Sequence, residues 1–296
     1  MMNTLYIGCP IWNHPSWFGS LYPAKSSGIV PLCAYATLFN SVEGNSSFYH
    51  LPDKSTLAQW ANLLPAHFRF TLKLPRSISH QGDLRQCGDL LQQALEHFSV
   101  LGNKLGSVML QLPASFGPTQ FPSLQHFVAH FPKNQCLAVE VRHPDFFAKG
   151  EAERQLNQLL NQHQADRIIM DTRALFACDA SHFPAPQAGL IREVQSKKPQ
   201  VPTNVIATGK YPIVRFVGHA DIEKTKDFYQ PWLGKIKQWL TEGLSPSLFF
   251  HMPDNKDAPW LAAAFMHDFN QRYPELGLAD LPLPAVQGQQ KSLFDS

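Results

Sequence analysis

The stretch Leu137-Ala138-Val139-Glu140-Val141-Arg142 is a short apolar run that ends on charged residues, and the pattern recurs along the chain. With residues 137–141, similar runs occupy residues 5–8, 41–42, 68–72, 107–110, 167–170, 213–217 and 248–250. Helix-forming segments separate most of these runs, and strands that alternate with helices form a parallel sheet. Eight such units close into a (β/α)₈ barrel, so the sequence predicts an α/β fold of the TIM-barrel type.

The length of 296 residues suits one barrel followed by a tail. A barrel takes roughly 250 residues, and we predict that residues 1–272 form it. Helices are expected over residues 29–40, 55–64, 88–101, 121–130, 151–163, 228–242 and 258–272. Residues 172–210 contain four prolines and no sustained period, so they are expected to cover the mouth as a lid or wall, with irregular helical pieces. Residues 273–296 are polar and proline-rich, which predicts a flexible tail.

Bulk composition narrows the class of protein. A net charge of +2 gives no general affinity for polyanions. The five cysteines are dispersed and have neither the spacing of a zinc knuckle nor that of a redox dithiol, which favours reduced thiols in the cytoplasm. No run approaches the roughly 18 apolar residues of a membrane span, and the first residues do not resemble a secretory signal.

Polar and ionisable residues stand at or just beyond the ends of the eight runs. Active sites of barrels lie at the carboxyl ends of the strands, so we expect these residues to converge at the mouth. The candidate catalytic residues are Glu43, Lys73, Glu140 and Asp171. The candidate substrate-binding residues are Trp12, Asn45, His80, Arg142, Arg215 and His219.

Each charged candidate also has a structural interpretation. Glu43 facing the barrel interior must be paired, protonated or bound to a cation, and Lys73 or Arg142 would serve as its partner. Glu140 and Arg142 share one face of a strand, so a mutual salt bridge is as consistent with the sequence as an acid–base pair. Lys73 fits best as a charge partner or an anion ligand, since nearby acids favour its ammonium form.

Metal binding is a further alternative. Glu43, Glu140, Asp171, His219 and His251 are possible ligands from several strands. No two histidines form a tight ligand pair at these strand ends, and the neighbouring cations would compete for the acids, so no metal is assigned and the cofactor stays unknown. The chain also lacks a Gly-x-Ser-x-Gly elbow and a glycine-rich phosphate loop, which argues against serine-nucleophile and nucleoside-triphosphate chemistry.

Several segments in order resemble the YecE-like family of unknown function. They include Gly8 with Trp12, Trp17-Phe18-Gly19, the run 42–49, Lys73, the run 139–143, Asp171 and Arg215 with Gly218. The resemblance covers about residues 6–272 and implies a TIM-type barrel without an established activity. Many relatives have an Asn-Asn pair near the end, whereas this chain reads His251-Met252-Pro253-Asp254-Asn255, so no family role passes to His251 or Asn255.

The tail ends in a second motif. Gln290-Lys291-Ser292-Leu293-Phe294 is similar to the pentapeptide that binds the bacterial DNA sliding clamp, with Lys291 in place of the usual leucine. An unstructured segment can place Leu293 and Phe294 in an apolar groove, while Gln290 and Ser292 make polar contacts.

Three functions are compatible with these observations. The first is an enzyme, with hydrolysis as a candidate reaction, that acts by acid–base chemistry on an anionic substrate containing phosphate or derived from nucleic acid. The second is a non-catalytic adaptor that is tethered to the sliding clamp. The third is a metal-dependent hydrolase at the same mouth.

Overall fold

The computed structural model describes residues 4–283 and confirms all eight predicted strands. They are β1 (Tyr6–Gly8), β2 (Ser41–Gly44), β3 (Arg69–Lys73), β4 (Leu105–Gln111), β5 (Cys136–Glu140), β6 (Asp166–Asp171), β7 (Ile213–Val217) and β8 (Ser247–His251). Every pairing is parallel, and the strands follow one another in the order β1-β8-β7-β6-β5-β4-β3-β2. The first and last strands of this order also contact each other, so the sheet is a nearly closed barrel.

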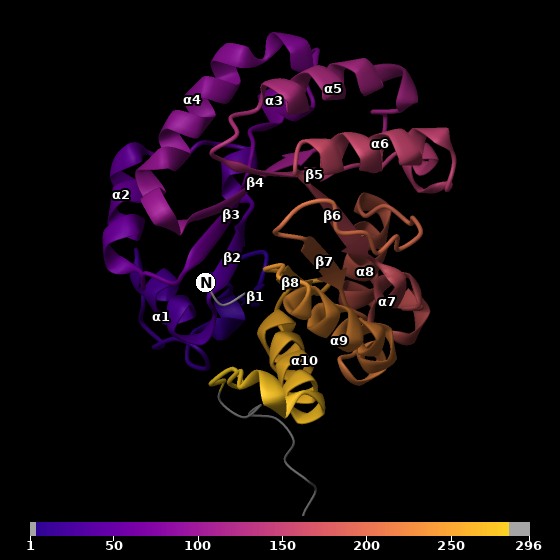
Figure 1. Cartoon of the computed structure of the whole chain (residues 1–296). Helices are drawn as coiled ribbons and strands as arrows, with labels where there is room; N and C mark the ends of the chain where they lie inside the picture. The colour runs from indigo at the N-terminus through magenta and orange to yellow at the C-terminus, as the bar shows by residue number, and fades with distance from the viewer. Residues whose placement is uncertain (1–3, 284–296) are drawn as a thin grey trace, which may run out of the picture.

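Helices surround the strands, as Figure 1 shows. Within residues 4–283 they are α1 (Val30–Leu38), α2 (Lys54–Leu63), α3 (Arg76–Ser79), α4 (Gly88–Phe98), α5 (Phe121–His130), α6 (Glu151–Gln162), α7 (Arg173–Phe176), α8 (Ala185–Lys197), α9 (Lys226–Thr241) and α10 (Ala258–Arg272). The seven predicted helices are all present, with ends that shift by at most three residues. No helix in this part of the chain is long and apolar enough to cross a membrane.

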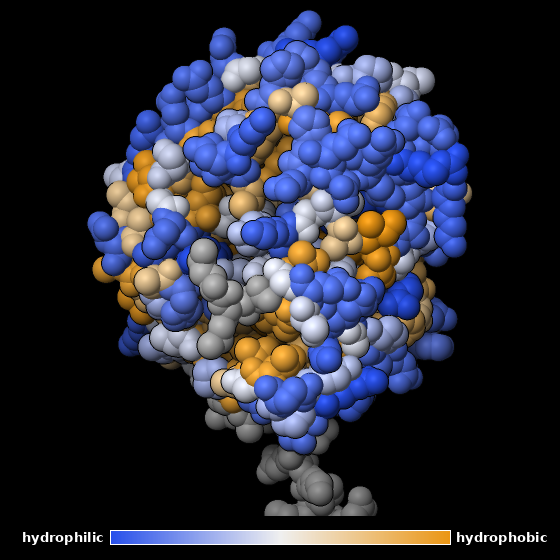
Figure 2. Space-filling model, viewed as in Figure 1, coloured by the Kyte–Doolittle hydropathy of each residue, from blue (hydrophilic) through white to orange (hydrophobic). Residues whose placement is uncertain are grey.

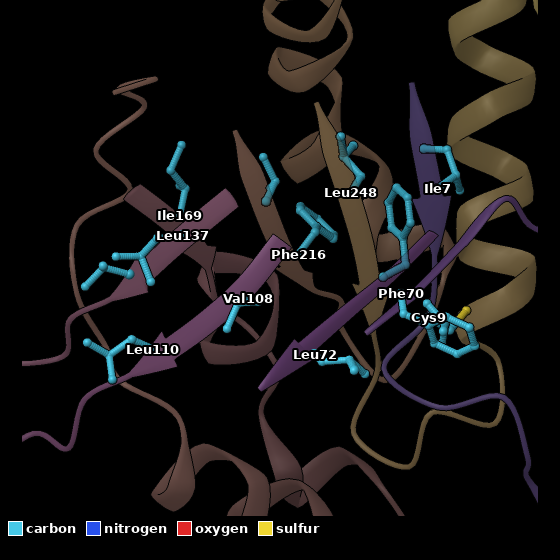
Figure 3. Close-up of a cluster of buried hydrophobic side chains, with 14 of the residues drawn as sticks. Ile7, Cys9, Phe70, Leu72, Val108, Leu110, Leu137, Ile169, Phe216 and Leu248 are labelled. Carbon is cyan, nitrogen blue, oxygen red and sulfur yellow. The ribbon is translucent and has the colours of Figure 1, made fainter. Parts of the chain in front are cut away.

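Side-chain alternation assigns each strand residue to one side of the barrel wall. Apolar side chains such as Val108, Leu110 and Phe216 point outward and pack against the helices (Figure 3). The inward residues form a much smaller apolar cluster of Met109, Ala138, Ile168, Ile213 and Phe249. The polar ends of the strands lie above this inner cluster, so the apolar core closes the barrel beneath its mouth.

The seam between β1 and β2 is joined largely by side chains. The Tyr35 hydroxyl accepts a hydrogen bond from the Cys9 N–H (2.7 Å) and donates one to the Ser41 carbonyl (3.0 Å). The Asn40 amide makes two more bonds to the backbone of the N-terminal strand region, at 2.8 and 2.9 Å. A buried phenol and a half-buried amide therefore replace most of the backbone ladder at this position.

Replacing Tyr35 with phenylalanine is expected to lower the free energy of unfolding by about 2–3 kcal/mol. The substitution leaves the buried Cys9 N–H and Ser41 carbonyl without their partner, and each unsatisfied group costs about 1–3 kcal/mol. Urea unfolding followed by circular dichroism measures the change. Tyr49→Phe removes a hydroxyl from a residue that is 80% exposed and should have almost no effect. Equal stability of the two variants would contradict this account of the seam.

The connection between β6 and β7 is more regular than expected. It contains α7 and the 13-residue α8, although no sustained helix was predicted between residues 172 and 210. Only Ala188 and Ile191 of α8 are buried, so the helix has almost no apolar stripe to recognise in the sequence. The helix ends at Lys197, because Pro199 disfavours helical backbone at the residue before it, Lys198.

The first part of the predicted tail lies on the barrel. Tyr273 packs edge-on against Phe269 of α10, and Asp280 accepts hydrogen bonds from His267 and Asn270. Leu281 is packed against the main core. Residues 273–283, the described part of the predicted tail, therefore make contacts with the barrel that the sequence did not predict. The residues of the clamp-like motif, Gln290, Ser292, Leu293 and Phe294, lie outside the described part of the chain.

Candidate active site at the barrel mouth

Arg215 occupies the centre of the barrel mouth and pairs with two carboxylates. It points inward from β7, and its guanidinium group donates two hydrogen bonds of 2.8 Å to Glu43 on β2. A third hydrogen bond goes to Glu140 on β5. All three side chains are at most 2% exposed. The predicted convergence of these residues from distant parts of the sequence is therefore present, and it takes the form of a buried ion-pair network.

Lys73, Gln111 and His251 complete the inner layer. The Lys73 ammonium donates to the Gln111 side-chain oxygen at 2.9 Å and lies 3.6 Å from a Glu43 oxygen. His251 Nε2 lies 3.2 Å from the other Glu43 oxygen. Gln111 and His251 both stand at predicted strand ends, but neither was chosen as a catalytic or substrate-binding residue, and His251 was considered only as a possible metal ligand. Their position at the end of an alternating strand is the signal that would have selected them.

Arg142 and His80 lie at the rim of this network. The Arg142 guanidinium group donates to Glu140 at 2.7 Å, so the predicted salt bridge is present, and its side chain keeps 18% of its surface exposed. His80 hydrogen-bonds Ser79 and packs edge-on against Phe48, whose ring also lies 6.0 Å from the Lys73 ammonium. Arg142 is thus more exposed than the other charged residues bonded in this network, Glu43, Lys73, Glu140 and Arg215.

The two carboxylates are held in their ionised form. Burial alone would raise the pKa of Glu43, but Arg215 and Lys73, with the hydrogen bond from His251, lower it well below its usual range. For Glu140, burial is outweighed by Arg215 and Arg142, which lower its pKa to about 2. Both acids are therefore charged at neutral pH, and their oxygens are engaged by cations.

The nitrogen bases at the mouth have lowered pKa values, which favour their neutral forms. Burial, with the positive charge of Arg215, lowers the pKa of Lys73 to about 8. Burial lowers the pKa of His251 to about 3, so its ring is neutral and donates its Nε2 hydrogen to Glu43. Burial and neighbouring cations also lower the pKa of His80. Near neutral pH, the groups at this site that can exchange protons are therefore amines, and the ionised acids hold these amines in place.

Lys198 is a member of the group that the sequence interpretation missed. Its side chain extends from the end of α8 and is half-buried. Burial and the charge of Arg215 lower its pKa to about 7. Glu43 and Glu140 oppose this shift, and Lys73 adds to it. It comes from the segment predicted to cover the mouth, which was the available signal.

Asp171 does not join the group, and this corrects the expectation that it converges with the others. It lies on the outward face of β6, two residues beyond Ile169 of the outer core. Its carboxylate accepts hydrogen bonds from Arg173 (2.7 and 2.9 Å) and from the Trp232 indole N–H (2.8 Å). These contacts fasten β6 to α7 and α9 instead of facing the mouth.

Three predicted substrate ligands are engaged in local structure. His219 accepts a hydrogen bond from the Asp221 N–H at 2.9 Å and lies near Phe183, away from the Arg215 network. Asn45 donates to the Pro10 carbonyl at 2.8 Å. Trp12 packs edge-on against Trp60, with 5.3 Å between ring centroids. The substrate contacts expected of them stay predictions.

The proposed metal ligands are not gathered at one point. Asp171 and His219 lie outside the network, while Glu43 and Glu140 are bonded by Arg215. Within residues 4–283 no group of three or more histidine, cysteine or acidic side chains has the arrangement of a metal site. The geometry therefore offers no support for metal binding by this set.

Two cavities elsewhere on the molecule are large, but few of the residues that line them could take part in catalysis. One, of about 610 Å³, lies between α4 and α5 and is lined by Leu91, Leu95 and Phe127; Figure 2 shows apolar surface in this region. The other, of about 680 Å³, lies at the end of the barrel where the strands begin, and its lining includes Tyr6, Arg69 and Cys136. Neither contains paired carboxylates or the Lys73–Lys198 combination, so the mouth is the better candidate despite the burial of its acids.

Comparison with known proteins identifies relatives along nearly the whole chain. The family model described as "Protein of unknown function DUF72" matches residues 6–287. The chain is 40% identical over 290 residues to the UPF0759 protein YecE of Escherichia coli K12, covering 98% of this chain and 100% of that protein.

Solved structures confirm the barrel fold. A DUF72 family protein from Enterococcus faecalis V583 matches with a TM-score of 0.66 at 19% identity, covering 95% of this chain and 99% of that one. A DUF72 family protein from Thermotoga maritima matches with a TM-score of 0.65 at 20% identity, covering 90% and 99%. At this level of identity the likeness concerns the fold alone.

Proposed function

This chain belongs to the DUF72 family of proteins of unknown function, and we propose that it is an enzyme that binds an anionic substrate at the barrel mouth and acts on it by acid–base chemistry. The observation that carries the proposal is the balance of charge in the Arg215 network. The carboxylates of Glu43 and Glu140 are matched by the guanidinium groups of Arg142 and Arg215. Each protonated lysine, Lys73 or Lys198, then adds positive charge that no carboxylate balances.

An anion is the ligand that this surplus favours. Arg142 offers a partly exposed guanidinium group at the rim, and guanidinium forms paired hydrogen bonds with phosphate or carboxylate oxygens. The surrounding groups are mostly buried, so the attraction is screened less than it would be on the surface. A phosphate-containing or nucleic-acid-derived compound fits this description.

Lys73 is the group that we propose to move protons. Its pKa of about 8 lets it exchange a proton near neutral pH, and Glu43 and Gln111 fix its position. Glu43 and Glu140 are too acidic to donate protons at neutral pH, so we assign them to holding the cations. Hydrolysis is one reaction that such a site supports. The five free thiols favour action in the cytoplasm.

Clamp binding by the tail stays a prediction that is separate from the barrel chemistry. An enzyme that acts on a nucleic-acid-derived substrate would benefit from such a tether.

Sulfate binding tests the proposed anion site, because sulfate keeps the same charge between pH 6 and 9. We expect Arg142→Gln to weaken binding by roughly 10–100-fold, as a hydrogen bond to a charged group contributes about 1.5–3 kcal/mol. Binding to the unchanged protein should also weaken from pH 6 to pH 9, because Lys198 and Lys73 lose their protons over that range. Isothermal titration calorimetry measures both effects.

Arg85→Gln is the matched control for that experiment. Arg85 is 58% exposed and pairs with Asp83, away from the mouth, so its removal should leave the sulfate affinity unchanged. Equal loss in the two variants, or an affinity that does not change with pH, would count against the proposed site.

A further inference from the structure

The end of the barrel opposite the mouth contains a polar cavity of about 680 Å³, called the lower cavity below. Thr71 on β3, Ser107 on β4 and Ser247 on β8 line it, and each is at most 7% exposed. The two serines stand two residues before Met109 and Phe249 of the inner apolar cluster, so strand alternation points them inward as well. The inner apolar cluster therefore lies between the lower cavity and the mouth.

The three buried hydroxyl groups of the lower cavity are free to bind a ligand. Those of Thr71, Ser107 and Ser247 form no hydrogen bond with any group of residues 4–283. In this part of the chain every fully enclosed side-chain oxygen has a partner, so these three oxygens must be accessible from the cavity. Each hydroxyl can both donate and accept a hydrogen bond, and buried polar groups in folded proteins are normally satisfied. A ligand with hydroxyl groups of its own matches this wall.

The charged residues on the wall of the lower cavity are cations. Among residues 4–283, its lining includes Arg69 and Lys210 and no acidic side chain, and neither cation forms an ion pair there. Arg69 Nη1 donates to the Ala66 and Phe68 carbonyls at 2.8 and 2.9 Å, which fixes the guanidinium group. Its Nε and Nη2 hydrogens have no partner in the same part of the chain. Such a group forms paired hydrogen bonds with phosphate or carboxylate oxygens, so the wall favours an anion.

We propose that the lower cavity is a second binding site, for a sugar phosphate or a similar small anion with several hydroxyl groups. The phosphate binds between the two cations, and the sugar hydroxyls reach the three buried hydroxyls of the wall. Tyr6 and Tyr211 also line the cavity, and their rings offer apolar faces to the carbon side of a sugar. The volume lies within the range of about 300–1,000 Å³ that is usual for small-molecule sites. This inference is independent of the proposed function, which concerns the opposite end of the barrel.

Cys136 provides a local reporter, because its half-buried thiol lines the lower cavity. Alkylation by iodoacetamide at pH 8, followed by peptide mass spectrometry, gives its reaction rate with and without glucose 6-phosphate. Burial raises the pKa of this thiol, so the reaction is slow and each cysteine serves as its own reference. We expect saturating glucose 6-phosphate to protect Cys136 and to leave the rate of Cys33, a half-buried thiol outside the cavity, unchanged. Glucose and inorganic phosphate, each with half of the required chemistry, should protect only at much higher concentrations.

Substitutions in the wall test which groups bind the ligand. Arg69→Gln should raise the glucose 6-phosphate concentration needed for protection of Cys136 by roughly 10–100-fold, and Thr71→Val, which keeps the side-chain shape, by roughly 3–10-fold. Thr71→Val decides the question alone if Arg69→Gln does not fold. Thr241→Val at an exposed position of α9 and Arg85→Gln are the matched controls and should not change the protection.

Arg142→Gln separates the two ends of the barrel. It removes the proposed anion ligand of the mouth, so protection of Cys136 should remain as it is in the unchanged protein. Loss of protection in this variant would assign the ligand to the mouth and overturn the second site. Absence of protection at millimolar glucose 6-phosphate, or protection that neither Arg69→Gln nor Thr71→Val weakens, would overturn it as well. Equal protection by inorganic phosphate would rule out recognition of the sugar.

Discussion

Replacing Arg215 with glutamine is expected to lower the free energy of unfolding by about 3–5 kcal/mol, the range found when one partner of a buried ion pair is removed. The substitution leaves Glu43 with Lys73 and His251 and leaves Glu140 with Arg142, so both carboxylates lose their strongest partner while they stay buried. Urea unfolding at pH 7, analysed by linear extrapolation, gives the difference.

Arg154→Gln provides the control for the stability measurement. Arg154 pairs with Glu151 on the surface of α6, where both side chains are about two-thirds exposed, and such pairs contribute less than about 1 kcal/mol. If the two variants lost similar amounts of stability, the Arg215 network would not be the buried structural centre that its geometry indicates.

Replacing Asp166 with asparagine is expected to stabilise the protein at alkaline pH, by up to about 4 kcal/mol at pH 8. Asp166 is buried at the start of β6, where its carboxylate accepts a hydrogen bond from the Tyr211 N–H (3.0 Å) and pairs with no cation among residues 4–283. Burial therefore raises its pKa from near 4 to about 7. Each tenfold change in the ionisation constant corresponds to about 1.4 kcal/mol, which sets the upper limit. The asparagine oxygen can still accept the Tyr211 hydrogen bond.

The pH dependence gives the sharper test of Asp166. The unfolded carboxyl ionises near pH 4 and the folded one near pH 7, so the folded protein binds more protons between these values. Stability of the unchanged protein therefore declines as pH rises through this window, and the gain from Asp166→Asn should be absent at pH 4 and complete above pH 7. Asp227→Asn, at an exposed position of α9, should show no such trend. A gain of the same size at pH 4 and pH 8 would contradict a buried ionisation.

The strands were predictable because both faces of a barrel wall are apolar. Side chains that face the interior and side chains that face the helices therefore form one short, continuous apolar run in the sequence. The helix α8 was not predictable in the same way, since only two of its residues are buried and no apolar period marks it. The contacts of residues 273–283 were also hidden, because they depend on single pairs such as Asp280 with Asn270.

The site was predictable where alternation fixed the side of the wall. Glu43, Glu140 and Arg215 follow or interrupt short apolar runs, and all three point inward. Asp171 is the last residue of β6, so its face depends on the exact register of that strand, and it proved to be the outer one. Lys198 was missed for another reason: its segment was expected to cover the mouth, but the position of a single residue depends on how this long connection folds back over the strands.

Because Tyr35 bridges β1 and β2 at the seam, a residue outside the mouth influences the positions of the strands that form it. Strands joined by a backbone ladder stand at a spacing of about 4.8 Å, which side chains barely influence. Across the seam, a phenol ring acts as the spacer, and the Glu43 N–H donates to the Cys9 carbonyl directly beside it. A shift of one ring would thus move the carboxylate on β2 relative to the arginine on β7. A substitution at Tyr35 on α1, outside the mouth, would therefore change the distance between opposite charges inside it.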